Sequence, residues 1–171
     1  TTNIFGGGNR GNVGLMTTVS IADSDVTNTV YGGGNEGTVG GATKVTVASS
    51  DIGESVFGGG KGFTATVGGT AVAFQTNSNT KKLYGGGDQG QVNGNTSVII
   101  ENSTIDYDVF GGGNGKASGT TEGKVSGSTN LIVRNSSGIG DGATVKEVDG
   151  TDSLDVYGEL IYNGNVFGGG C

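Results

Sequence analysis

The sequence predicts an all-β protein, a parallel β-solenoid of the right-handed β-helix type. Three observations lead to this prediction. An aromatic residue followed by three glycines recurs at nearly constant spacing, a period-two pattern of Thr, Val and Ile follows most copies, and 39 of the 171 residues are glycine while none is proline. No window shows the 3.6-residue apolar period of a helix, so we expect strands and turns only.

The aromatic-triglycine repeat sets the length of each coil. Successive aromatic residues are 26, 26, 27, 26 and 57 positions apart, and they are Phe5, Tyr31, Phe57, Tyr84, Phe110 and Phe167. A unit this short cannot bury an apolar face alone, whereas stacked units share one continuous core. We therefore expect about six coils of about 26 residues, with the last interval holding two coils or one coil and an inserted excursion.

Each coil is expected to contain three short strands. One ends at the aromatic residue, and one lies eight positions later, at Val13, Val39 and Val92. The third is a Thr-x-Val-x-Val/Ile segment, the alternation of a half-buried strand. This segment shifts by one residue in the third copy, which begins at Thr70, and by seven in the fifth, which begins at Thr129. The seven-residue insertion is expected within 116–123.

The chain is interpreted as one repeat domain over 1–171. Regular coils cover 4–134, an irregular coil or a protruding hairpin covers 135–165, and a further repeat starts at 166–171. Both ends carry the same repeat phase and no obvious cap, which predicts a piece of a longer rod or a unit that stacks head to tail. Cys171 is the only cysteine, so no internal disulfide is expected.

The net charge and the absence of histidine exclude several kinds of binding partner and catalytic group. Nine Lys and Arg face 16 Asp and Glu, for a net charge of −7, and there is no histidine. A nucleic acid or an anionic membrane surface requires a basic face, so we expect neither partner. The chain has no apolar run long enough for membrane insertion. The lack of histidine also removes the commonest general base and the usual zinc ligand.

The repeat itself suggests a family. Residues 30–39, Val-Tyr-Gly-Gly-Gly-Asn-Glu-Gly-Thr-Val, resemble the glycine-rich β-helical repeats of large bacterial surface proteins, including adhesins and autotransporter passenger regions. The resemblance is one of repeat style and contains no catalytic motif. It implies secretion, an extracellular or cell-surface location, a filament role, and adhesion to carbohydrates or cells.

The aromatic residues and glycines form a candidate assembly or ligand stripe. Neighbouring residues in a strand point to opposite faces, so inward valines would leave the aromatic side chains outward, where they could stack on sugars or another rod. Alternatively the chain bends here and the aromatic side chains fill a corner of the core. The stripe comprises Phe5, Tyr31, Phe57, Tyr84, Phe110, Phe167, Gly32, Gly33, Gly34, Gly85, Gly86 and Gly87.

Acidic residues offer the remaining candidates. Asp25 and Asp51 share one position of the repeat and would lie about 4.8 Å apart, a distance that calcium could bridge, although solvated turn carboxylates give the same pattern. No other metal and no cofactor is expected. Carboxylate pairs for a polysaccharide-active enzyme could come from two groups, which are Glu101, Asp106 and Asp108, or Asp149, Asp152 and Asp155. Neither group stands out from the general scatter of acids, so no catalytic residue is assigned.

Together these features predict a non-enzymatic extracellular module, a self-stacking subunit or segment of a bacterial surface fibre or stalk. Its partners would be copies of itself, bound head to tail and laterally. The alternative is an adhesin that binds glycans or host surfaces along the aromatic-glycine stripe.

Overall fold

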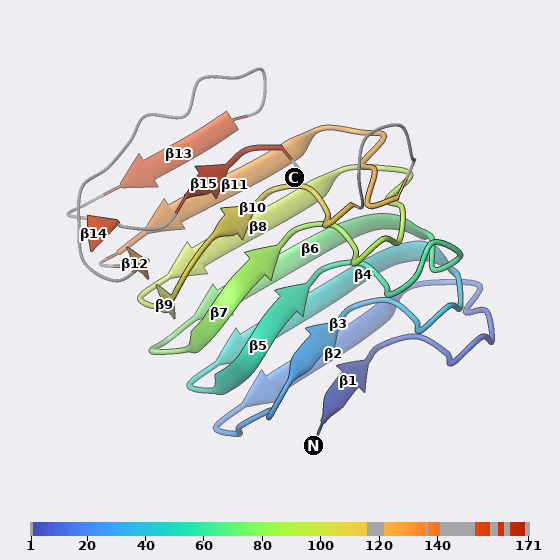
Figure 1. The fold of residues 1–171 in the computed structure, drawn as a ribbon, viewed down its shortest axis with the longest axis horizontal. Coiled ribbons are helices and arrows are strands. Elements are labelled where there is room, and N and C mark those ends of the chain that lie inside the picture. Colours follow the sequence, from blue (N-terminus) through green and yellow to red (C-terminus); the bar gives the residue numbers. More distant parts are fainter. Residues whose placement is uncertain are drawn as a thin grey trace.

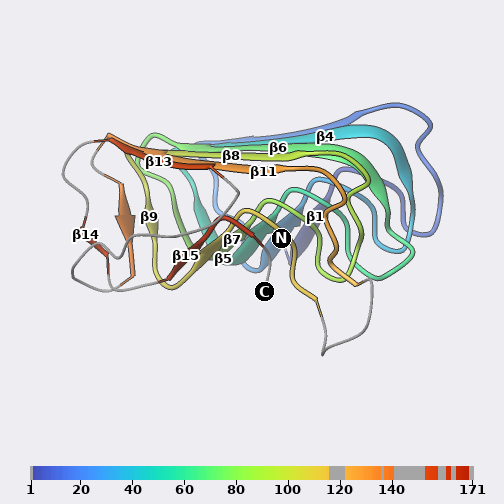
Figure 2. The ribbon, with the colours of Figure 1, turned by 90° about the horizontal axis from the view of Figure 1, so that it is seen from above.

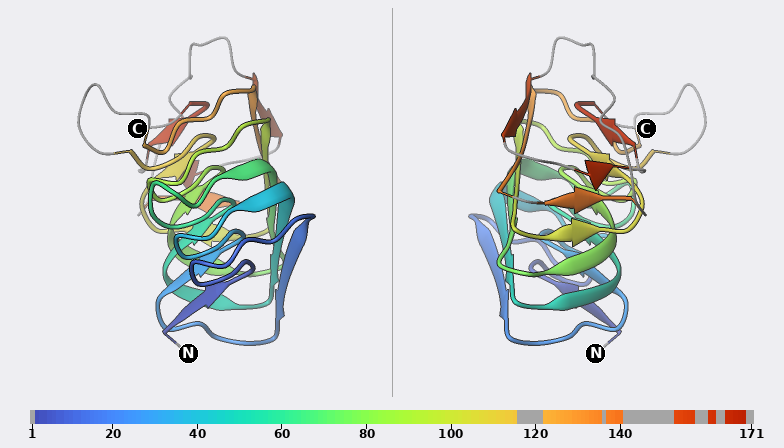
Figure 3. Two further views of the ribbon diagram at one scale, coloured as in Figure 1. Left: turned by 90° about the vertical axis from the view of Figure 1, so that its right-hand side faces the viewer. Right: turned by 90° about the vertical axis from the view of Figure 1, so that its left-hand side faces the viewer.

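The computed structural model describes residues 2–115, 122–135, 137–140, 153–157, 161–162 and 165–169. The chain is a parallel β-solenoid of about four turns of about 27 residues, built from two parallel sheets. Figure 1 shows the strands of successive turns side by side, and Figure 3 shows the turns stacked one above another from the N-terminus. Within the described residues, no helix has the length and apolar character needed to cross a bilayer.

One sheet has six strands in the order β13-β11-β8-β6-β4-β2. It is made of the Thr-x-Val-x-Val segments, whose described side chains alternate between the core and the outer face. The strands are β2 (Thr17–Ala22), β4 (Val39–Ala48), β6 (Val67–Gln75), β8 (Thr96–Glu101), β11 (Thr129–Arg134) and β13 (Ser153–Tyr157).

The register of this sheet confirms both predicted shifts. Thr43 pairs with Thr70, and Thr96 pairs with Thr129. The extra residues of the fifth copy are also placed by pairing, because Asp88 pairs with Asn114 and Val92 pairs with Val125. Four positions in one turn thus correspond to eleven in the next, which leaves seven inserted residues between 114 and 125. Residues 116–121 themselves lie outside the described part of the chain.

The second sheet has nine strands and contains the aromatic residues of the repeat. Figure 2 shows it across the core from the six-stranded sheet. The strands are β1 (Asn3–Phe5), β3 (Thr29–Tyr31), β5 (Asp51–Phe57), β7 (Asn79–Tyr84), β9 (Thr104–Ile105), β10 (Val109–Phe110), β12 (Gly138–Ile139), β14 (Ile161–Tyr162) and β15 (Val166–Phe167).

The prediction of three strands per coil needs correction, because two sheets line the coil. The valines that follow the triglycine segments also pair from turn to turn. They lie eight positions after the aromatic residue at Val13, Val39 and Val92, ten at Val67 and fifteen at Val125. Single β-bridges join Val13 to Val39, Val67 to Val92, and Val92 to Val125. At least four residues separate these valines from the preceding triglycine, and at these three junctions only isolated residues come into register. In β4 and β6 this position merges with the next strand through a bulge. The right-handed sense and the count of six coils stay predictions.

The main core lies between the two sheets and consists almost entirely of Val, Ile and Leu. Val30 and Val56 of the nine-stranded sheet are completely buried in it, as are Val45 and Val47 of the six-stranded sheet. Each turn stacks its apolar side chains on those of its neighbours, so the core is one continuous column.

The region expected to be an irregular coil or hairpin lies largely outside the described residues. Within it, β13 pairs in parallel with β11, and β14 pairs in parallel with β12. These two segments therefore extend both sheets, as a further coil would.

Candidate functional site

The aromatic residues of the repeat form a continuous ladder, referred to below as the aromatic ladder. The five stacked pairs have ring centroids 4.5 to 5.2 Å apart and interplanar angles of 2° to 8°. The four inner rings are 4% to 7% exposed, whereas Phe167 is 41% exposed. Along its length the ladder therefore offers no free ring face, and a ring face is accessible only at its ends.

The ladder is separate from the main core. Val30 packs in the main core, while Tyr31, the next residue, belongs to a distinct cluster made of the rings alone. Burial and, secondarily, the nearby Asp88 carboxylate raise the pKa of Tyr31 to about 12. The phenol consequently stays neutral at physiological pH and interacts with Thr29 and Asp88.

Three glycines follow each ring, and those predicted for the stripe, Gly32–Gly34 and Gly85–Gly87, are all buried. A Cβ on Gly32 would run into the carbonyl oxygen of Gly58 in the next turn and lie 2.9 Å from Cγ2 of Val45. A Cβ on Gly33 would lie 2.8 Å from the backbone N of Gly60. These glycines, which we call the glycine corner, are thus required by the close approach of adjacent turns.

A column of buried threonines ties the six-stranded sheet to the glycine corner. The hydroxyl of each donates to the carbonyl of the first glycine of a triglycine, at 2.5 to 2.7 Å for four of them. The pairs are Thr17 with Gly32, Thr43 with Gly58, Thr70 with Gly85, Thr96 with Gly111 and Thr129 with Gly168. Sequence reasoning missed this link, although the Thr-to-Gly spacing of 15 residues in four of the pairs was a visible signal.

The proposed calcium pair is close together but exposed. The backbone N–H of Asp51 donates to Oδ1 of Asp25 at 3.4 Å, and both side chains face solvent. In the described ranges no three acidic or thiol side chains are grouped closely enough to hold a metal ion. The pair therefore supplies two carboxylates and no third protein ligand of that kind.

The acids considered for catalysis have structural partners. Asp106 accepts a hydrogen bond from Asn79 at 2.9 Å. Glu101 and Asp108 bind side chains of other turns, which are Arg134 and Asn135 for Glu101, and Lys82 and Asn165 for Asp108. Of the second group, Asp149 and Asp152 lie outside the described residues, and Asp155 lies in β13.

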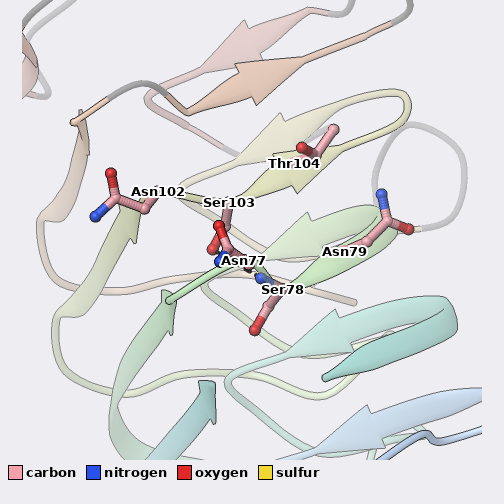
Figure 4. A pocket seen from close by; sticks show the side chains of 6 residues that line it. All are labelled: Asn77, Ser78, Asn79, Asn102, Ser103 and Thr104. Carbon is pink, nitrogen blue, oxygen red and sulfur yellow. Dashed lines mark hydrogen bonds between the residues drawn. The ribbon is translucent and has the colours of Figure 1, made fainter. Parts of the chain in front are cut away.

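A shallow polar depression of about 270 Å³ lies where the chain passes from the six-stranded to the nine-stranded sheet. Two consecutive turns contribute to it, with Asn77, Ser78 and Asn79 from one, and Asn102, Ser103 and Thr104 from the next. Figure 4 shows Asn79 and Thr104 on one side of this corner and Asn102 on the other. Sequence reasoning did not single out this site.

The fold defines the class of protein, which is a parallel β-solenoid. Comparison of the chain with protein-family models, curated proteins and solved structures gives no match.

Proposed function

We propose that the chain is a non-enzymatic structural module, a stacking unit of an extracellular bacterial fibre or stalk. The proposal includes a right-handed coil and six turns, and the six-stranded sheet supports that number. The observation that carries it is the repetition of one set of contacts from turn to turn. Aromatic rings, threonine hydroxyls and glycine carbonyls meet in the same way at each junction, which is a design suited to axial extension.

Backbone groups at the outermost described strands support stacking in the same register. In β1, the N–H of Gly6 donates to Tyr31, so the alternate residue Phe5 directs its backbone groups away from β3. In β15, the carbonyls of Asn165 and Phe167 accept from β10, so Val166 directs its groups away from β10. These two outward sets are complementary in the way that consecutive turns are.

We therefore propose that β15 of one copy pairs with β1 of the next and places Phe167 on Phe5. Such a contact is heterologous and continues along the axis. It would extend the aromatic ladder and both sheets across the junction, with turns about 4.8 Å apart.

The test is electron microscopy and sedimentation of the purified chain over a range of concentrations. We expect filaments that lengthen with concentration, and a Val166→Pro variant that keeps the β-sheet circular dichroism but does not stack. Proline removes the outward N–H of Val166 and leaves the pairing with β10 intact.

A second test of the same contact mixes the Val166→Pro variant with the wild-type chain. The variant still presents β1, so it should bind one end of a growing wild-type filament and shorten it when added in small amounts. Short single rods at all concentrations, or equal assembly of the Val166→Pro variant, would contradict the proposal. A Phe63→Ala variant, altered at an exposed loop residue, serves as the control and should assemble normally.

A further inference from the structure

Tyr107 is an exposed aromatic residue in the bend between β9 and β10, two strands of the nine-stranded sheet. It is 54% exposed, whereas Tyr31 and Tyr84 of the aromatic ladder are 4% and 5% exposed. Its backbone N–H donates to the carbonyl of Lys81 at 2.9 Å, which fixes the residue directly above Lys81 in the stack of turns. The residue is thus held in the bend between β9 and β10 and offers apolar ring surface that a ligand could cover.

Polar side chains lie close to Tyr107 in the chain and in the two preceding turns. The amide of Asn79 donates to Asp106 at 2.9 Å, directly beside Tyr107 in the chain. Below it, the ammonium group of Lys81 is 2.8 Å from Glu54, and this contact raises the pKa of Lys81. Three consecutive turns therefore present carboxylate, amide and ammonium groups about 4.8 Å apart along the axis.

The polar depression adjoins the same group. Asn79 lines it and also bonds to Asp106, and Thr104 lines it two residues before Asp106. Figure 4 shows Asn79 and Thr104 on the same side of the corner. A hollow with hydroxyl and amide groups thus shares Asn79 with the Asn79–Asp106 pair, and Asp106 is the chain neighbour of the exposed Tyr107. Small-ligand sites likewise combine aromatic surface with a few orienting polar groups.

We propose that this face binds a neutral oligosaccharide. One sugar ring packs its C–H face on Tyr107, and hydroxyl groups of the adjoining sugar bond to Asn79, Asp106 and Thr104. Sugar hydroxyls both donate and accept hydrogen bonds, as this mixed set requires. Asp106 and the net charge of −7 disfavour an anionic sugar.

The site is independent of axial stacking, because it lies on the side of the rod. It also differs from the aromatic-glycine stripe that the sequence suggested for glycans, whose rings are buried. Binding at Tyr107 would leave both strand edges of the solenoid free, so the two proposals can fail separately.

The experiment is a titration followed by ¹⁵N–¹H NMR and calorimetry. Cellohexaose and N-acetylchitohexaose are the neutral probes, and hexagalacturonate is the anionic one. We expect saturable shifts at Asn79, Thr104, Asp106 and Tyr107 with at least one neutral probe. A Tyr107→Ala variant should weaken that binding at least about tenfold, the loss typical of an aromatic anchor.

Phe63→Ala is the matched control, because Phe63 is 65% exposed but does not line the polar depression. It should bind the neutral probe like the wild type. The proposal is overturned by the absence of saturable binding of both neutral probes up to about 10 mM, a very weak affinity. Equal loss in both variants, or tighter binding of hexagalacturonate, would overturn it as well. A Thr104→Ala variant with native circular dichroism gives a second measure of the polar contacts and should also weaken binding.

Discussion

Each turn of the solenoid reverses direction at two corners that tolerate different residues. The glycine corner follows the aromatic residue, as at Gly32–Gly34, and its positions are buried against backbone atoms of the adjacent turns. The other corner, called here the serine corner, follows the six-stranded sheet. Its first residue is exposed and has a left-handed φ of 47° to 54° in Asp23, Ser49, Asn102 and Asn135.

Different physical constraints determine which residues each corner accepts. At the glycine corner the constraint is space, because adjacent turns approach so closely that a methyl group collides with a carbonyl. At the serine corner the constraint is one dihedral angle, which Asn and Asp adopt more readily than most residues. A buried serine then caps the turn, as Ser50 does by donating to Ala48 at 2.8 Å. Composition is therefore restricted at one corner and varied at the other.

The largest loss of stability is expected from a substitution at the glycine corner. Gly32→Ala should lower the free energy of unfolding by about 3 kcal/mol, because the added methyl group meets backbone atoms that cannot move away. Gly14→Ala is the matched control, since nothing lies within 4 Å of a Cβ there. Urea unfolding followed by circular dichroism measures both. Equal stability of the two variants would contradict the role assigned to close approach.

Much of the fold was predictable because strand residues obey a simple alternation. Thr70 and Thr129 were assigned to their strands from the Thr-x-Val-x-Val pattern, and their pairing confirms the assignment. The valines that lie eight positions after an aromatic residue, such as Val13 and Val92, also repeat from turn to turn, yet they form only single β-bridges. A repeat in the sequence predicts which residues occupy equivalent positions in successive turns. It does not predict how many residues on either side also pair, and therefore how long a strand is.

The surfaces were less predictable. Because neighbouring residues of a strand point to opposite faces, the sequence predicted that Tyr31 and Val30 lie on different faces. Whether the Tyr31 ring is then covered depends on the path of the following loop, which no local sequence pattern encodes. Tyr107 escaped notice for a different reason. It stands in the column of Glu54 and Lys81, so it has no repeated counterpart, and a search for repeats overlooks a residue that occurs once.

Loss of a threonine hydroxyl that links the six-stranded sheet to the glycine corner should have an intermediate effect on stability. Thr43→Val keeps the shape of the side chain but leaves the buried carbonyl of Gly58 without its hydroxyl donor, at a cost of about 2 kcal/mol. Thr46→Val on the outer face of the same strand is the control and should change stability by less than about 0.5 kcal/mol. Equal small changes in thermal and urea unfolding for both variants would show that the Thr43 contact contributes nothing.

The smallest effect, and one of opposite sign, is expected at the serine corner. Ser49 has φ 50° and an exposed side chain, and Asn102 and Asn135 occupy the equivalent position in later turns. Ser49→Asn should therefore raise the free energy of unfolding by about 0.5 kcal/mol, because asparagine tolerates the left-handed region better. Ser49→Val provides the contrast and should lower it by about 1 to 2 kcal/mol, because a β-branched side chain crowds the backbone at positive φ. Measured urea midpoints that rank Val above Asn would show that this corner, like the glycine corner, is governed by packing and not by its dihedral angle.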